Sequence, residues 1–331
     1  MLRTRLAPLA LAAAALAVAL LLAELLLAWL HPVGFRRPAE PVPGDLWRNL
    51  LHQPSPVPGL AYELAPSREA VAGGVTFRTN RYGMRYGSPG TEGPKSRSRI
   101  VVVGDSFTFG FGVEAEDSYP SVLEEILGPS DFHVLNLGVG GYSARDAVLA
   151  LEHKGMSWDP VLVVVGYVLN DPEIEPIQPL HRHYEHVRWW QRSNLLRLLA
   201  SARHRLEVRV RGRGDYYRYL HHPDGAKWKS VEAAFARIAE LTRGRGVPAL
   251  VVIFPMILQS SWAEYPNRDL HQQVAELAHA HGLHVLDLYE TFSSEAVAAI
   301  RSGPGDAHPS ARGHALAAMA IRQWMIDHQR R

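Results

Sequence analysis

Apolar residues in the last two thirds of the chain come in short, uninterrupted runs of Val, Ile and Leu. Each run is followed by a turn and then, directly or after an insertion, by residues with a helical spacing of apolar positions. Runs without polar alternation are typical of strands buried on both faces. The pattern predicts strands at 100–103, 133–137, 161–165, 249–254 and 284–288, and helices at 118–127, 143–154, 229–242, 269–281 and 310–327. We therefore expect a doubly wound, flavodoxin-like α/β domain, with a mostly parallel five-stranded sheet in an α/β/α arrangement.

A different pattern occupies the amino terminus, where residues 6–30 are Leu, Ala, Val and Trp, interrupted by Pro8 and Glu24. As a helix, these roughly 25 residues extend over about 37 Å, longer than the bilayer hydrocarbon core of about 30 Å. Basic residues before this stretch favour a cytoplasmic amino terminus. We predict a single-pass anchor over residues 1–30 in the inner or plasma membrane, with the rest outside the cytoplasm. A cleaved signal peptide is the alternative, since residues 17–19 satisfy the small-residue rule.

Between these two regions, residues 31–98 are rich in proline, which is typical of a spacer or of an irregular strip packed on the domain. The domain itself is expected over residues 99–331, with an insertion at about 178–228. The insertion carries nine arginines between Arg182 and Arg213, together with Trp189 and Trp190. A basic amphipathic helix of this kind can lie on anionic lipid, cover a site as a lid, or be a solvated insertion.

Composition narrows the possible chemistry. Lys and Arg number 35 against 33 Asp and Glu, so the net charge gives no reason to expect a nucleic-acid partner. The chain has no cysteine, which excludes disulfides, thiolate metal sites and a cysteine nucleophile.

Two short motifs supply a serine, a histidine and an acid. Gly104-Asp105-Ser106 follows the first predicted strand, and Asp306-Ala307-His308 precedes the last helix. A histidine can remove the serine proton, while a neighbouring carboxylate orients the imidazole, which predicts acyl transfer. Asp-x-His can also form a metal pair, but neither residue has a histidine partner at helical spacing, and we expect neither metal nor cofactor. His314 is expected to pack.

Two further turns could donate hydrogen bonds to an oxyanion. The turn after the second strand contains Gly138, Gly140 and Gly141, whose backbone N–H groups can approach a ligand closely. The turn after the third strand presents the Asn170 amide. A dinucleotide-binding loop is not completed, because Ser143 stands where Gly-x-Gly-x-x-Gly requires its last glycine.

These four motifs, in this order, resemble those of the SGNH or GDSL hydrolase family over about residues 99–328, and residues 77–85 resemble a segment of its membrane-anchored bacterial members. The resemblance implies Ser106 as nucleophile and a triad completed by Asp306 and His308. It also implies an oxyanion hole made by the N–H groups of Ser106 and Gly141 and by the Asn170 amide. The chain departs from the family pattern in having one residue, not two, between the acid and the histidine.

The function expected is therefore a membrane-tethered serine esterase or deacylase that forms an acyl-serine and acts on O-acylated glycans of the cell envelope. Its partners would be a small-molecule or glycan ester and, through the amino-terminal helix, the membrane. An O-acyltransferase for a surface polysaccharide shares the same acyl-enzyme, and a non-catalytic envelope protein that binds glycan or a partner is the third possibility. An α/β hydrolase is disfavoured because no Gly-x-Ser-x-Gly elbow is present.

Overall fold

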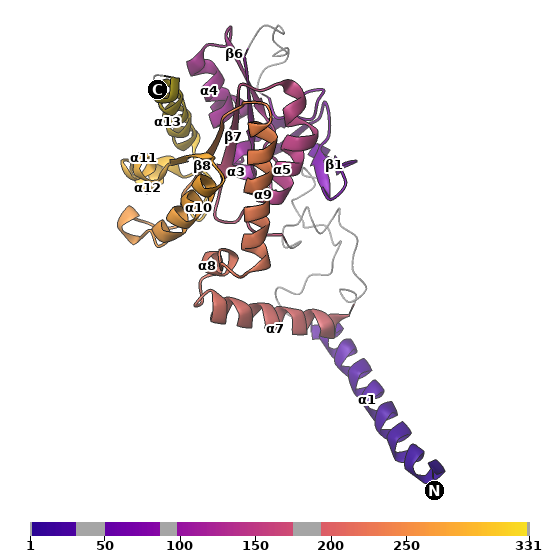
Figure 1. The fold of residues 1–331 in the computed structure, drawn as a ribbon. Coiled ribbons are helices and arrows are strands. Elements are labelled where there is room, and N and C mark those ends of the chain that lie inside the picture. The colour runs from indigo at the N-terminus through magenta and orange to yellow at the C-terminus, as the bar shows by residue number, and fades with distance from the viewer. Residues whose placement is uncertain (1, 31–49, 87–97, 175–192, 330–331) are drawn as a thin grey trace.

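The computed structural model describes residues 2–30, 50–86, 98–174 and 193–329 (Figure 1). At its centre lies a five-stranded, entirely parallel sheet with the strand order β6-β5-β7-β8-β9. Numbered along the chain, this is the flavodoxin-like order 2-1-3-4-5, which the apolar runs predicted. The strands are β5 (Ser98–Val103), β6 (Phe132–Asn136), β7 (Leu162–Tyr167), β8 (Ala249–Ile253) and β9 (His284–Asp287).

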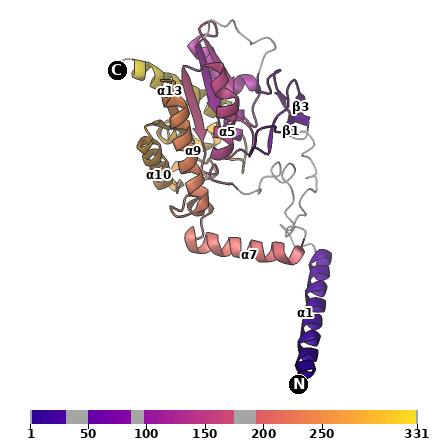
Figure 2. The same ribbon diagram turned by 45° about the vertical axis from the view of Figure 1, so that its right-hand side comes forward.

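Helices cover both faces of this sheet (Figure 2). On one face α4 (Tyr119–Leu127) packs against α13 (Ala311–Gln329). On the other, α5 (Ala144–His153) and α10 (Arg268–Ala280) each contact α9 (Ala226–Arg243). The five long helices confirm the expected three layers, with ends within a few residues of the predicted ones. Shorter helices are α3 (Ser106–Phe109), α11 (Tyr289–Ser293) and α12 (Val297–Ile300), with 3₁₀ turns at Ala115–Asp117, Gly155–Trp158 and Trp262–Glu264.

Residues 50–86 form two antiparallel hairpins that pack on the sheet domain. The first joins β1 (His52–Pro54) to β2 (Tyr62–Leu64), and the second joins β3 (Glu69–Ala72) to β4 (Val75–Arg78). They share a second hydrophobic cluster with the domain, in which the Phe77 ring stacks on that of Phe109 at 5.4 Å. This part of the proline-rich region is therefore structured and built into the domain surface, whereas residues 31–49 and 87–97 lie outside the described residues.

Two helices stand apart from the layers (Figure 1). The first, α1 (Leu2–Leu30), contains the stretch Ala10–Leu30, which has a mean hydropathy of 2.5, is not buried, and is long enough to cross a membrane. A signal sequence has the same properties. The second, α7 (Asn194–Arg211), is followed by the short α8 (Tyr216–Leu220), and both belong to the basic insertion. The remaining predicted features of the insertion, Arg182, Arg188, Arg192, Trp189 and Trp190, lie outside the described residues.

Candidate active site

Ser106 is the first residue of α3, immediately beyond the carboxyl end of β5. The helix begins there because the Asp105 side chain caps it, accepting a hydrogen bond of 2.9 Å from the Phe107 N–H. Gly104 permits the tight turn, since a Cβ at this position would lie 2.3 Å from the Thr108 Oγ1 and 2.7 Å from the Gly166 carbonyl oxygen. The turn therefore presents the Ser106 hydroxyl at the edge of the sheet where ligands of such folds bind.

His308 reaches this hydroxyl from the loop before α13. Its Nε2 lies 2.8 Å from the Ser106 Oγ, and its Nδ1 lies 2.5 Å from the Asp306 Oδ1. The same carboxylate oxygen accepts a 2.9 Å bond from the His308 backbone N–H, so the two-residue loop fixes both groups. Hydrogen bonding from the His308 side chain holds the pKa of Asp306 below its usual value. Residues more than two hundred positions apart thus form one continuous chain of hydrogen bonds.

Aromatic rings hold the imidazole from the side of α3. The centroids of the Phe107 and Phe111 rings lie 5.1 Å and 4.9 Å from that of His308. The His308 side chain remains 22% exposed, and that of Asp306 35%. The imidazole is therefore packed on one side and open to solvent, and hence to a substrate, on the other.

The structure also brings the two candidate donor turns to Ser106. The Asn170 Nδ2 donates to the Asp105 Oδ2 at 3.3 Å, and its second N–H stays available because an amide nitrogen carries two hydrogens. Gly141 has a positive φ of 83°, and a Cβ on its neighbour Gly140 would lie 4.0 Å from the Ser106 Cβ. Within the described residues, the backbone N–H groups of Ser106 and Gly141 donate no hydrogen bond. These N–H groups and the amide are thus free to bind an anionic oxygen.

Asp105 is a site residue for which no role was predicted. It is almost completely buried and accepts hydrogen bonds from the Phe107 backbone and from Asn170, and its Oδ2 lies 3.5 Å from the Ser106 Oγ. Burial raises the pKa of Asp105, and the Phe107 N–H partly offsets this. Its position inside the Gly-Asp-Ser tripeptide was the available signal: a residue between a strand and a helix-opening serine is placed to cap that helix.

A second group that the sequence did not reveal lies shortly after the amino-terminal hairpins. The Arg85 guanidinium is 4% exposed and donates to the carbonyl oxygens of Phe109 and Val113 at 2.6 Å, and also to that of Gly110. Burial lowers the pKa of Arg85 to about 10, so it stays charged at neutral pH. It fixes the loop that holds Phe111 against His308.

The opposite side of the site receives a similar support. The Tyr62 hydroxyl donates to the Gly140 carbonyl oxygen at 2.9 Å, and the Tyr142 hydroxyl donates to the Tyr62 carbonyl oxygen at 2.8 Å. Both bonds are buried or partly buried, where a lost partner costs about 1–3 kcal/mol. The hairpins and the residues that follow them therefore support the glycine turn as well as the loop after α3.

Metal binding was the alternative use of the Asp-x-His pair. Among the residues that the structure describes, no group of three or more His, Cys, Asp or Glu side chains could hold a metal ion. His314 is fully buried in α13, and its Nδ1 accepts a 3.3 Å bond from the Tyr119 backbone N–H. Burial lowers the pKa of His314 to about 3, which keeps it neutral.

The flavodoxin-like sheet and a Ser–His–Asp chain of hydrogen bonds at its carboxyl edge are the features of an ester hydrolase. The GDSL-like lipase/acylhydrolase family model matches residues 102–316 of the 331-residue chain, and the chain belongs to this family. It is thus a GDSL-type hydrolase, as the four motifs indicated.

Solved structures with a similar fold include several esterases. A lipase/acylhydrolase from Enterococcus faecalis is 18% identical, with 69% of this chain and 95% of that chain covered and a TM-score of 0.42. An acetyl xylan esterase is 16% identical, with coverages of 68% and 98% and a TM-score of 0.44. An acetylxylan esterase from Geobacillus stearothermophilus is 15% identical, with coverages of 70% and 95% and a TM-score of 0.44. Comparison with curated proteins gave no match.

Proposed function

We propose that this chain is a membrane-tethered serine ester hydrolase in which Ser106 is the nucleophile, His308 the general base and Asp306 the carboxylate that orients it. The observation that carries the proposal is the pair of short contacts on one imidazole, 2.8 Å to the Ser106 Oγ and 2.5 Å to the Asp306 Oδ1. They define the tautomer: Nδ1–H donates to Asp306, which leaves Nε2 to accept the serine proton. The assembled contacts favour an enzyme over a protein that only binds glycan.

The reaction proceeds in two halves. Ser106 Oγ attacks the ester carbonyl carbon while its proton passes to Nε2 of His308, and the carbonyl oxygen becomes an oxyanion. The N–H groups of Ser106 and Gly141 and the Asn170 amide stabilise that oxyanion. His308 then gives its proton to the leaving alcohol, an acyl-Ser106 remains, and water activated by the same imidazole releases the acid.

Acyl transfer to a sugar hydroxyl would use the same acyl-enzyme, with the hydroxyl in place of water. Membership in a family of lipases and acylhydrolases favours water as the acceptor. We propose O-acylated glycans of the cell envelope as substrates, because the predicted topology places the domain outside the cytoplasm, where such esters occur.

The proposed organisation follows from α1. Residues 1–30 would anchor the chain in the inner or plasma membrane, residues 31–98 would form the amino-terminal extension, and residues 99–331 the hydrolase domain with its insertion. The support for the anchor is the exposed apolar stretch Ala10–Leu30. This assignment makes the protein a membrane-anchored member of its family.

The proposal is tested with the full-length chain in detergent micelles. Wild-type protein should cleave a short-chain aryl acetate, and a serine-reactive phosphonate should add its mass to the peptide that contains Ser106. Ser106→Ala should abolish both, whereas Ser130→Ala, which changes an exposed serine before β6, should abolish neither. Wild-type protein that neither turns over nor takes the label would contradict the proposal.

A further inference from the structure

The basic helix α7 exposes an apolar stripe from Leu199 to Val210. Leu199, Leu206 and Val210 are 56%, 60% and 69% exposed, and at helical spacing they lie on one side, together with the exposed Ala202. Exposed arginines, namely Arg203, Arg205 and Arg209, flank the stripe on both sides. Arg203 also forms an ion pair with Glu207. An apolar stripe bordered by arginines is the pattern of a helix that lies in the membrane interface.

The opposite side of α7 is already occupied by α8. The Tyr219 hydroxyl donates to Glu207 at 3.1 Å, and the His204 ring meets that of Tyr219 at 5.4 Å, edge to face. The exposed stripe is therefore the side that faces away from the protein. In the part of the chain that the structure describes, α8 thus covers one side of the carboxyl half of α7, and the apolar stripe on the other side is exposed.

At its amino end, α7 is joined to the helix that could span the membrane. Glu24, the only acidic residue between positions 6 and 30, accepts hydrogen bonds from the Ser193 hydroxyl at 2.9 Å and the Leu195 N–H at 3.0 Å, and also from the Asn194 N–H. A carboxylate at this place satisfies N–H groups that a helix end leaves unpaired and complements its dipole.

The depth at which this junction would lie in the membrane suits a helix at the membrane interface. Glu24 precedes Leu30, the last residue of α1, by six residues, which is about 9 Å along a helix. Interfacial helices bury their apolar face about 5–10 Å into the boundary between headgroups and acyl chains. Figures 1 and 2 both show α7 running crosswise to α1. If α1 crosses the bilayer, α7 lies along its surface.

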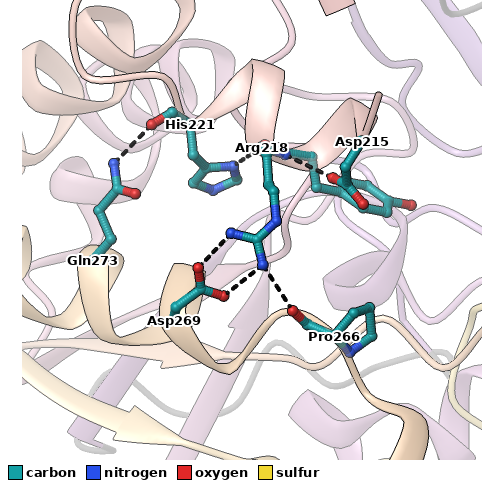
Figure 3. Close-up of polar contacts among 7 residues, drawn as sticks. Asp215, Arg218, His221, Pro266, Asp269 and Gln273 are labelled. Atoms are coloured by element: carbon teal, nitrogen blue, oxygen red, sulfur yellow. Dashed lines mark hydrogen bonds and ion pairs between the residues drawn. The ribbon is translucent and has the colours of Figure 1, made fainter. Parts of the chain in front are cut away.

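At its other end, α7 is tied to the hydrolase domain through α8 (Figure 3). Asp215 caps α8, Arg218 forms an ion pair with both carboxylate oxygens of Asp269 in α10, and Gln273 donates to the His221 carbonyl oxygen at 2.8 Å. These contacts fix α8 on the domain, so the orientation of α7 determines the orientation of the sheet.

The contacts of α8 lie at the carboxyl ends of the strands, where the candidate active site also lies. The Nε2 of His221 lies 2.9 Å from the hydroxyl of Tyr167, the last residue of β7. Since all five strands are parallel, the carboxyl end of β7 lies at the same edge as the carboxyl end of β5, which Ser106 follows. The surface of α7 and the site therefore belong to one end of the domain.

We propose that α7 docks on the anionic lipid surface of the membrane that α1 crosses, and that it thereby turns the Ser106 edge of the sheet toward the bilayer. The proposal rests on the membrane anchor proposed above and deepens it. The occupant of the apolar stripe is lipid, because the helix that carries the stripe begins at the spanning helix and the arginines beside the stripe complement anionic headgroups. The substrate ester would then be met at the membrane surface.

The absence of native cysteine makes a direct test possible. Leu206→Cys, labelled with a nitrobenzoxadiazole dye in the full-length chain, is reconstituted into vesicles of phosphatidylcholine and phosphatidylglycerol, with or without a nitroxide-labelled lipid. We expect blue-shifted emission that the nitroxide lipid quenches. The matched control, Ser130→Cys in the exposed loop before β6, should give neither effect.

The arginines beside the apolar stripe provide a second test of the docking. On vesicles that contain phosphatidylglycerol, Arg203→Gln, Arg205→Gln and Arg209→Gln should each lower the ratio of docked to undocked α7 roughly fivefold. The dye at position 206 reports this ratio as a loss of quenching. The same losses on vesicles of pure phosphatidylcholine would contradict an electrostatic contact with lipid.

Each remaining outcome separates this proposal from the proposed function. If the dye at position 206 is as exposed to water as the one at 130, while the chain resists alkaline extraction from the vesicles, the anchor stands and the docking of α7 is wrong. Blue-shifted emission that the nitroxide lipid does not quench would mean that α7 covers a protein surface as a lid, which also overturns the proposal. Release at alkaline pH would contradict both the anchor and the docking, whereas aryl acetate turnover of the same sample tests the catalytic residues alone.

Discussion

Two histidine–carboxylate pairs lie in this domain with similar hydrogen-bond geometry and different surroundings. His308 and Asp306 are 2.5 Å apart, and His271 and Asp287 are 2.8 Å apart, in both cases from Nδ1 to a carboxylate oxygen. On its other nitrogen each imidazole meets a hydroxyl, that of Ser106 at 2.8 Å or that of Tyr265 at 2.6 Å. A search for an acid, a histidine and a hydroxyl in series would find both.

The surroundings separate the two pairs. The His271 side chain is 1% exposed, against 22% for His308. Burial raises the pKa of the Tyr265 phenol, and its ring packs among those of Trp262 and Tyr289. The Ser106 hydroxyl instead lies beside the Asn170 amide and the glycine turn. Acyl transfer therefore requires that a substrate can reach the hydroxyl and that oxyanion donors lie beside it, as well as the relay of hydrogen bonds.

The largest expected effect comes from making the same substitution in each pair. His308→Gln removes the proposed base, so kcat for an aryl acetate should fall roughly 10⁴–10⁶-fold. His271→Gln should leave kcat unchanged and lower the free energy of unfolding by about 1–3 kcal/mol, because buried polar partners lose their hydrogen bonds. Initial rates and urea denaturation, both on the full chain in micelles, measure the two quantities.

Either variant can overturn the roles assigned to the two histidines. An active His308→Gln variant would remove His308 from the mechanism. A His271→Gln variant that is stable but inactive would show that the buried pair takes part in the reaction, contrary to our assignment.

A smaller effect is expected at the oxyanion donors. Asn170→Ala removes one of three proposed donors and should lower kcat roughly 10²–10³-fold. Asn267→Ala is the matched control, because Asn267 is a buried asparagine at the residue before α10, near the second pair, and it should leave kcat unchanged. Steady-state kinetics with the aryl acetate distinguish the two, and an Asn170→Ala variant with the wild-type rate would show that the third motif supplies no donor.

The sequence predicted the parallel sheet and the candidate residues because each of these has a local signal. Apolar runs mark the parallel strands, and Ser106 and Asn170 follow two of them within a few positions. The ligand-binding edge of a parallel sheet then places such residues near one another without further information.

What the sequence did not predict depends on contacts between distant segments. Arg85 stands in a charged and aromatic stretch, and nothing near it indicates that its guanidinium binds the carbonyl group of the last residue of α3 and two carbonyl groups after it. Glu24 and the start of α7 are about 170 residues apart, and His271 and Asp287 belong to a helix and a strand with no motif between them. Such pairs form because distant segments pack together, and the pattern of apolar and polar residues near each partner does not predict this packing.

The smallest expected effect concerns stability and contrasts the exposed His308 with the fully buried His314. Burial lowers the pKa of His314 to about 3, whereas a histidine in the unfolded chain titrates near 6.5. Between these values the unfolded state binds a proton that the folded state does not, so His314 makes the folded state less stable as pH falls below about 6.5. The slope is about 1.4 kcal/mol per pH unit, or roughly 2 kcal/mol between pH 7.5 and pH 5.

His314→Gln, whose amide oxygen can accept the Tyr119 N–H in place of Nδ1, should weaken the pH dependence of the free energy of unfolding by that amount. Urea denaturation at the two pH values measures it, and an unchanged pH dependence in the variant would mean that His314 is protonated in the fold, which its burial opposes.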